Sequence, residues 1–157
     1  GVGLGFTLRS CLGAVGPETC VAIVEFIPAV IDWDRSHLTQ WNGALLDNPR
    51  VTVKVRGVYR EICAAKPQSY DAILLDVDNG PFAMVAADNA SLYSDIGIHL
   101  ICRAFKPGGR AVFWSAGRDP KFGDQLNKAE LKFDAIPAKS HDGAERAAYL
   151  IYVLELR

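Results

Sequence analysis

The pattern of apolar and polar residues gives its clearest structural signal between Tyr70 and Pro81. An unbroken apolar run, Ala72 to Leu75, is followed by Asp76 and Asp78, and the pattern then breaks at Asn79-Gly80-Pro81. This is typical of a strand that is buried on both faces of a parallel sheet and ends in a polar loop. Ligands of open α/β sheets bind beyond the carboxyl ends of the strands, so both aspartates are candidate site residues. The alternative is that they only cap a turn.

The spacing of apolar residues predicts the other elements of the chain. Further strands are expected at Cys20 to Phe26, Val51 to Val55, Ala111 to Trp114, Leu131 to Ile136 and Ala147 to Leu156. Helices are expected at Phe6 to Ala14, Pro28 to Leu38, Tyr59 to Ala65, Ser94 to Phe105 and Pro120 to Leu131. Trp33 and Trp41 are expected to be packing residues. Strands that alternate with helices and end in a closing strand pair predict an α/β, doubly wound, mostly parallel sheet in a single domain.

The chain opens with a glycine turn, GVGLG, directly before the first expected helix. Gly1, Gly3 and Gly5 allow a tight turn and the close approach of a ligand, and the helix start presents free N–H groups. Glycine turns are frequent, and in a nucleoside site the turn directly follows a strand. No strand precedes Gly1 in the sequence, so we expect that strand to lie upstream of it.

Glu25 ends the strand expected at Cys20 to Phe26, about twenty residues after the glycine turn. At this distance an acidic residue at the tip of the second strand can accept hydrogen bonds from the hydroxyls of a ribose. The alternative is a solvated charge at a strand end. The glycine turn and Glu25 together predict a nucleoside site.

Composition excludes several classes of function. The chain has 157 residues, half of them hydrophobic, and its 17 basic and 18 acidic side chains nearly cancel. No positive field is therefore available to attract nucleic acid or anionic lipid. No apolar run reaches the roughly 20 residues of a membrane span, and no signal peptide is visible, so a cytoplasmic protein is expected.

Cysteine and histidine spacing gives no sign of a metal site or a disulfide framework. The four cysteines and three histidines are scattered along the chain, without the paired spacing of zinc ligands. We expect reduced cysteines in the core and no metal.

Four motifs in this order carry a resemblance to a known family: GVGLG, VAIVEF, YDAILLDVDNGP, and FKPGG followed by AVFW. The chain resembles the class I S-adenosylmethionine-dependent methyltransferase fold and, within it, the spermidine/spermine synthase (aminopropyltransferase) family. The resemblance covers nearly the whole chain. It implies a Rossmann-like sheet with a final antiparallel strand inside it, for which the counterpart here is Ala147 to Leu156.

The resemblance assigns the donor side of the site to the first part of the chain. Gly1, Gly3 and Gly5 would pass under the methionine-derived portion of the donor. Glu25 would hold the ribose, and Phe26 would lie against the adenine.

At the ends of the third and fourth strands the chain departs from the family pattern. The family usually has an aspartate that contacts the adenine amine after the glycine of the third strand, whereas this chain has Gly57 and Val58. Asp76 matches the catalytic aspartate. The second family aspartate is replaced by Asn79, with Asp78 one residue earlier, so these two residues are the candidates for binding the acceptor amine.

The resemblance implies a transferase that moves an aminopropyl group from decarboxylated S-adenosylmethionine to a polyamine or other small amine, and it allows a homodimer. A methyltransferase that uses S-adenosylmethionine itself is the first alternative, because a carboxylate at a strand end can simply line a pocket. A nucleoside-binding protein without catalysis is the second. Val58, Asn79 and the lack of the family's amino-terminal β-rich domain in this sequence favour the second alternative, whereas Gly3, Gly5, Glu25 and Asp76 oppose it.

Overall fold

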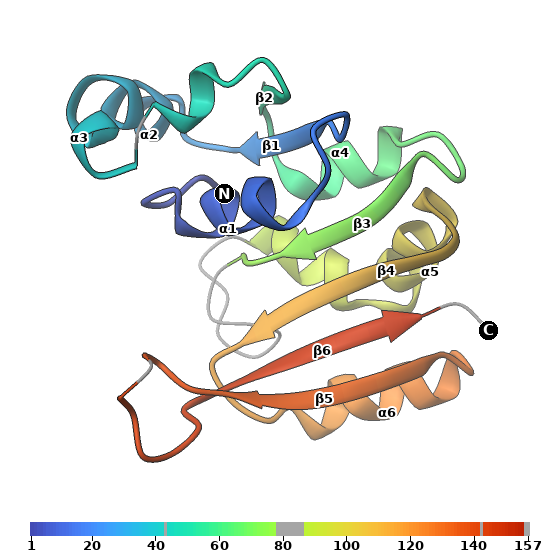
Figure 1. Ribbon diagram of the computed structural model, residues 1–157. Helices are drawn as coiled ribbons and strands as arrows, with labels where there is room; N and C mark the ends of the chain where they lie inside the picture. Colours follow the sequence, from blue (N-terminus) through green and yellow to red (C-terminus); the bar gives the residue numbers. More distant parts are fainter. Residues whose placement is uncertain (43, 78–86, 142, 156–157) are drawn as a thin grey trace. The chain divides into compact units, whose positions relative to one another are not determined.

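A computed structural model describes residues 1–42, 44–77, 87–141 and 143–155 (Figure 1). The chain divides into two compact units, Gly1–Glu61 and Ile62–Arg157, and each is described by itself. The single nucleoside-binding domain stays a prediction. In the described part of the chain, no helix combines the length and the apolar character that crossing a membrane requires.

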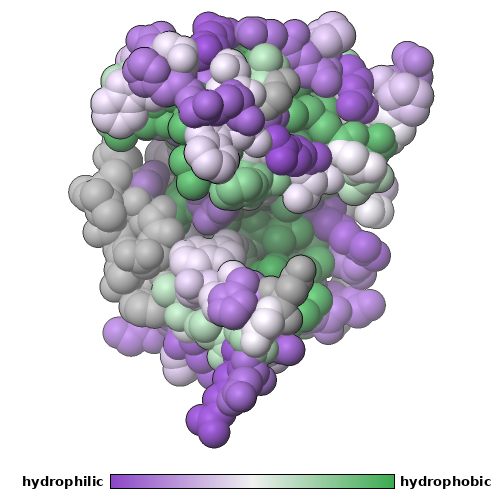
Figure 2. Space-filling view, turned by 60° about the vertical axis from the view of Figure 1, so that its left-hand side comes forward, coloured by the Kyte–Doolittle hydropathy of each residue, from purple (hydrophilic) through white to green (hydrophobic). Residues whose placement is uncertain are grey.

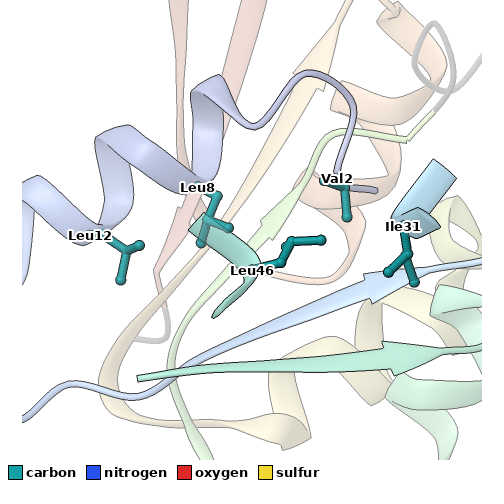
Figure 3. Packing of buried hydrophobic residues seen from close by; sticks show 5 residues of the cluster. All are labelled: Val2, Leu8, Leu12, Ile31 and Leu46. Atoms are coloured by element: carbon teal, nitrogen blue, oxygen red, sulfur yellow. The ribbon is translucent and has the colours of Figure 1, made fainter. Parts of the chain in front are cut away.

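The first unit is built on two parallel strands. β1 (Val21–Glu25) and β2 (Val51–Val55) pair in register, from Val21 opposite Val51 to Glu25 opposite Val55. The helical elements of this unit are α1 (Phe6–Ala14), α2 (Pro28–Trp33), the π-helical turn η1 (Asp34–Leu38), α3 (Thr39–Asn42), the 3₁₀ turn η2 (Leu45–Asp47) and the start of α4 (Val58–Ala64). Apolar side chains of these helices, of the two strands and of the opening turn form one core, which includes Val2, Leu8, Leu12, Ile31 and Leu46 (Figure 3).

The structure confirms most elements predicted in this unit and corrects two details. The helix Phe6–Ala14 and the strand Val51–Val55 have the predicted bounds. The helix predicted from Pro28 changes to π-helical geometry at Asp34, which turns that side chain into the interior. Trp33 and Trp41 are 61% and 69% exposed, so the expectation that they are packing residues is wrong. Trp41 follows the π-helical turn, and the change of helix type rotates the faces that a regular helical spacing predicts beyond it.

The second unit holds a mixed sheet of four strands. These are β3 (Tyr70–Leu75), β4 (Phe105–Ser115), β5 (Lys132–Ala138) and β6 (Tyr149–Glu155), in the order β3-β4-β6-β5. β3 and β4 are parallel, whereas β6 is antiparallel to both of its neighbours. The predicted antiparallel strand inside the sheet is therefore confirmed. The helices are η3 (Ala87–Tyr93), α5 (Asp95–Ala104) and α6 (Pro120–Lys128).

Burial along β3 differs from the prediction. Ile73 and Leu75 are buried, but Leu74 is 50% exposed, so only one face of the strand is covered. An unbroken apolar run does not by itself show that both faces are covered, because successive side chains of a strand point to opposite faces. β3 is also the edge strand of its sheet, where side chains have neighbours on one side only.

β4 begins earlier than the predicted strand at Ala111. It starts at Phe105, directly after α5, and its pairing with β3 shifts between Tyr70 and Ala72. Gly109 lies at this irregularity, where a Cβ atom would come within 2.8 Å of the Lys106 carbonyl oxygen and 3.0 Å of the Asp71 carbonyl oxygen. The glycine thus permits a close approach of two backbones, which a propensity argument does not detect.

Candidate functional site

Glu25 connects the glycine turn to the tip of β1. Its carboxylate accepts a hydrogen bond from the Val2 amide at 2.9 Å and one from the Ile27 amide, also at 2.9 Å. The residue is 8% exposed, so Glu25 is not a solvated charge at a strand end. Hydrogen bonds to an ionised acceptor are the stronger kind, and these two hold the turn beside the strand.

The glycines of the turn differ in backbone conformation and in the space around them. Gly3 and Gly5 have φ of 55° and 80°, in the left-handed region that glycine adopts without strain. A Cβ atom on Gly1 would lie 2.9 Å from Oε2 of Glu25. A Cβ atom on Gly3 would meet no described atom within 4 Å, so the backbone there faces open space. The turn is therefore closed on the Glu25 side and accessible at Gly3.

The turn leads directly into α1. The Gly5 amide donates to the Val2 carbonyl oxygen at 3.0 Å, and the Gly5 carbonyl oxygen accepts from the Arg9 amide at 2.9 Å as the first bond of the helix. No side chain of the described residues caps this helix start. The N–H groups of the first turn of α1 are thus available to a polar ligand.

The end of β2 lies beside Glu25. The Arg56 amide donates to the Glu25 carbonyl oxygen at 3.0 Å, which continues the pairing of the two strands. A Cβ atom on Gly57 would lie 4.0 Å from the Phe26 ring, and this ring is 72% exposed. Val58 follows as the first residue of α4. The structure therefore brings together, within the first unit, all donor-side residues predicted from the sequence.

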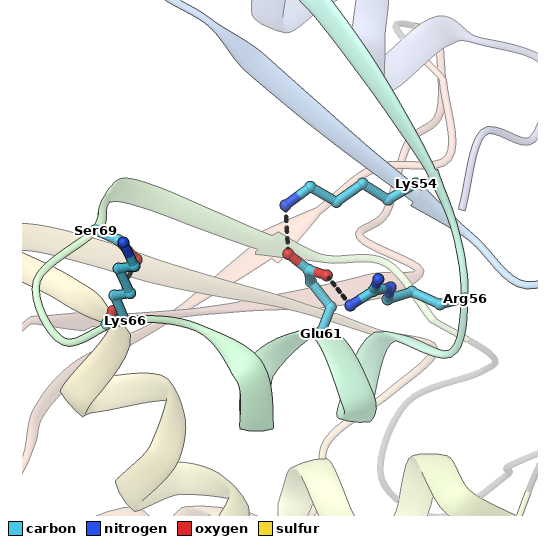
Figure 4. A network of polar contacts seen from close by, with 5 residues as sticks. All are labelled: Lys54, Arg56, Glu61, Lys66 and Ser69. Atoms are coloured by element: carbon cyan, nitrogen blue, oxygen red, sulfur yellow. Dashed lines mark hydrogen bonds and ion pairs between the residues drawn. The ribbon is translucent and has the colours of Figure 1, made fainter.

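Sequence reasoning missed a cluster of charges at this strand end. Glu61 of α4 is 7% exposed and forms ion pairs with Lys54 at 2.5 Å and Arg56 at 3.2 Å (Figure 4). Both cations come from β2 or directly after it, so the cluster ties the start of α4 to that strand. The sequence does contain a signal for this cluster. Lys54 and Arg56 are basic residues at alternate positions, and the acidic Glu61 follows in the first turn of the next helix.

Sequence reasoning also missed a polar pair behind the glycine turn. Nδ2 of Asn42 donates to Oδ2 of Asp34 at 2.6 Å, and both residues are buried. Burial raises the pKa of the Asp34 carboxyl, an effect that the bond from Asn42 opposes. No local pattern marks this pair, because it depends on the π-helical turn.

Apolar side chains reach the surface beside the turn. Leu4, Phe6, Leu38 and Trp41 line a pocket of about 190 Å³ in the first unit. Figure 2 shows hydrophobic residues, in green, among hydrophilic ones on one face of the protein. The exposed hydrophobic residues of the first unit include Leu4, Phe6, Phe26, Ile27 and both of its tryptophans.

The acceptor-side candidates lie in the second unit. Asp76 directly follows β3 and is exposed. Asp78 and Asn79 lie outside the described residues. Within the ranges that the structure describes, no group of three or more histidine, cysteine, aspartate or glutamate side chains is placed to hold a metal ion.

The sequence is related to proteins of known activity. No family model matches it. It is 34% identical to a polyamine aminopropyltransferase of Mycobacterium tuberculosis over 114 residues, which cover 71% of this chain and 21% of that protein. It is 31% identical to a polyamine aminopropyltransferase of Sulfurisphaera tokodaii over 77 residues, which cover 49% of this chain and 25% of that protein. The chain thus spans about a quarter or less of these relatives.

Solved structures share the fold. Human methyltransferase-like protein 13 in complex with SAH matches with a TM-score of 0.73 at 19% identity, over 100% of this chain and 69% of that one. A spermidine synthase in complex with the transition state analogue AdoDATO matches with a TM-score of 0.67 at 19% identity, over 99% of this chain and 52% of that one.

These findings define the class of the protein. It has an α/β Rossmann-like fold of the S-adenosylmethionine-dependent methyltransferase type, with a mixed sheet. The chain is a distant homologue of the polyamine aminopropyltransferases, in the transferase superfamily that includes the spermidine synthases.

Proposed function

We propose that this chain is a spermidine synthase-like transferase that moves an aminopropyl group from decarboxylated S-adenosylmethionine to a polyamine or other small amine. The observation that carries the proposal is the Glu25 carboxylate, held at the tip of β1 against the glycine turn. The named activity of the homologous aminopropyltransferases supports the choice of reaction.

The donor site would lie at the glycine turn and the ends of β1 and β2. Each oxygen of an ionised carboxylate has lone pairs for about two hydrogen bonds, so Glu25 can hold the backbone and still accept ribose hydroxyls. The exposed ring of Phe26 offers a face for the adenine, and Gly57 leaves room beside it. The side chain of Val58 offers no polar group to the adenine amine, so we assign base recognition mainly to stacking on Phe26.

The chemistry requires a neutral amine. Its nitrogen lone pair forms a bond to the aminopropyl carbon next to the donor's sulfonium. The carbon–sulfur bond breaks as this bond forms, and its electron pair leaves with sulfur in methylthioadenosine. A primary amine near pH 7 is almost entirely protonated, so a base must first remove a proton. We assign this role to Asp76, as a general base worth about two to four orders of magnitude in rate.

Asp78 and Asn79 complete the proposed acceptor side. A carboxylate attracts a second ammonium group of a polyamine by a charge-assisted hydrogen bond. The amide oxygen of Asn79 can accept a bond from the same group but adds no charge. A single-amine acceptor would need neither.

Calorimetric titration with three ligands tests the proposal. Decarboxylated S-adenosylmethionine and methylthioadenosine should bind, and S-adenosylmethionine should bind at least about tenfold more weakly, because its carboxylate has no assigned partner. Turnover should then appear with the decarboxylated donor and an amine. Preference for S-adenosylmethionine would favour methyl transfer. Human methyltransferase-like protein 13, whose fold this chain shares, is named for that reaction. Binding of methylthioadenosine without turnover with either donor would leave a nucleoside-binding protein.

A further inference from the structure

Asn42 packs directly against the glycine turn. A Cβ atom placed on Gly5 would lie 3.3 Å from both Cβ and Nδ2 of Asn42, and 3.3 Å from Cδ1 of Leu45. Gly5 is the residue with φ of 80° that ends the turn and begins α1. The Asn42 side chain therefore fills the space behind the position where the chain has its left-handed conformation.

Asp34 anchors that side chain. Its Oδ2 atom accepts the 2.6 Å bond from Nδ2 of Asn42, and the two residues are 1% and 2% exposed. The second carboxylate oxygen of Asp34 and the amide oxygen of Asn42, both Oδ1, have no hydrogen-bond partner among the described residues. Burying polar atoms without partners costs free energy, so packing alone does not account for this pair. A directional bond, unlike apolar contact, holds the amide in one orientation.

The π-helical turn is what brings the two residues together. Asp34 is its first residue, and Asn42 ends α3, eight positions later in the chain. π-helical turns are rare and are often found at functional sites. The same segment contacts α1 a second time, because the Arg9 guanidinium donates to the Trp41 carbonyl oxygen.

We propose that Asp34 and Asn42 are positioning residues for the nucleoside site: through their buried hydrogen bond they hold Gly5, and with it the turn from Gly1 to Gly5, in the conformation that receives the ligand. The inference rests on the proposed function for the identity of the ligand. The conformation of the turn itself can be measured without one.

Two measurements on the same variants test this inference. The first is hydrogen exchange of the Gly5 amide in the ligand-free protein, which reports on its bond to Val2. The second is the affinity for methylthioadenosine. Asn42→Ala should speed exchange at Gly5 by about tenfold or more beyond its effect on global unfolding, and should weaken the affinity by a similar factor. Asp34→Asn should stay within about threefold of the parent in both, since its amide oxygen can still accept the bond.

Leu12→Ala is the matched control. Leu12 lies in the same core, and its truncation destabilises the unit without removing an atom beside Gly5. If Asn42→Ala does not fold, Asp34→Ala makes the same test, because Asn42 then keeps its bulk and loses its anchor.

Equal effects of Asn42→Ala and Leu12→Ala on Gly5 exchange would overturn the inference, and so would an Asp34→Asn variant as impaired as Asp34→Ala. Absence of methylthioadenosine binding in the parent would overturn the proposed function instead, and the exchange measurement would still decide the role of the pair.

Discussion

The amide of Val2 donates a 2.9 Å hydrogen bond to the carboxylate of Glu25, 23 residues further along the chain. This bond joins the glycine turn to the tip of β1. The second oxygen of the same carboxylate accepts from Ile27, at the start of α2. One side chain thus joins the glycine turn, the tip of β1 and the start of α2, and the first two of these segments belong to the proposed nucleoside site.

Replacing Glu25 by glutamine should affect both binding and stability. The new NH₂ group cannot accept a bond from Val2 or Ile27, and charge-assisted acceptance of ribose hydroxyls is lost. We expect the affinity for methylthioadenosine to fall by about 1.5 to 3 kcal/mol and the free energy of unfolding by about 1 to 3 kcal/mol. Calorimetry and urea unfolding measure the two effects. Glu18→Gln, at an exposed position of the same unit, should change neither. An unchanged dissociation constant for Glu25→Gln would remove Glu25 from the site.

Asp76→Asn should separate binding from turnover. If Asp76 frees the amine, the variant should bind methylthioadenosine as the parent does, while turnover with a polyamine falls by about two orders of magnitude or more. High pH should restore part of the rate, because more of the amine is then deprotonated. Asp71→Asn, an exposed change on β3, is the control. Transfer at the parental rate near neutral pH by Asp76→Asn would rule out Asp76 as the base.

Asp34 should make the stability of the protein fall as pH rises. Burial raises the pKa of its carboxyl in the folded protein, with a smaller contribution from Asp47, while the bond from Asn42 and the charge of Arg35 oppose the rise. The folded state therefore binds the proton more tightly than the unfolded state does. From about pH 4, where an unfolded aspartate titrates, up to the folded pKa, this group removes stability as pH increases.

Asp34→Asn should remove that pH dependence. The melting temperature of the variant, compared with the parent from pH 4 to pH 8, should show a gain that grows with pH and then levels off. A constant difference across this range would contradict the assignment.

Glu61→Gln should loosen α4 from β2. The ion pairs with Lys54 and Arg56 involve a buried carboxylate but cations whose side chains are 35% and 50% exposed. Solvent screening of the cations limits the expected loss to about 1 to 2 kcal/mol of unfolding free energy. A double-mutant cycle with Lys54→Met measures the pairwise part. Additive effects of the two changes would show that the pair contributes nothing.

Alkylation rates of the cysteines should follow their burial. Cys20 and Cys63 are exposed, so the expectation that the cysteines lie in the core is wrong for these two. Burial raises the pKa of Cys102 to about 11. At pH 8 only about one Cys102 thiol in a thousand is then the reactive thiolate. Mass spectrometry after brief iodoacetamide treatment should find Cys20 and Cys63 modified and Cys102 intact. Early modification of Cys102 would show that its surroundings open readily.

The sequence by itself determined the features that depend on neighbouring residues. The apolar spacing of Phe6 to Ala14 and the alternation of Val51 to Val55 predict a helix and a strand whose bounds the structure reproduces. Asp119 before Pro120 marks the start of α6, and the structure shows its side chain accepting from the amides of Lys121 and Phe122. These signals are local because capping and helical periodicity involve only residues within a few positions of each other.

The tertiary structure alone decided the features that join distant residues. The bond from Val2 to Glu25 and the contact of Asn42 with Gly5 span 23 residues and more. The burial of Asp34 depends on a π-helical turn, and the exposure of Leu74 depends on which face of β3 is covered. Spacing could place Glu25 at a strand tip, but only the packed chain shows which groups its carboxylate accepts bonds from. Burial and hydrogen bonding between distant segments depend on how the elements pack, and local residue patterns do not reveal this packing.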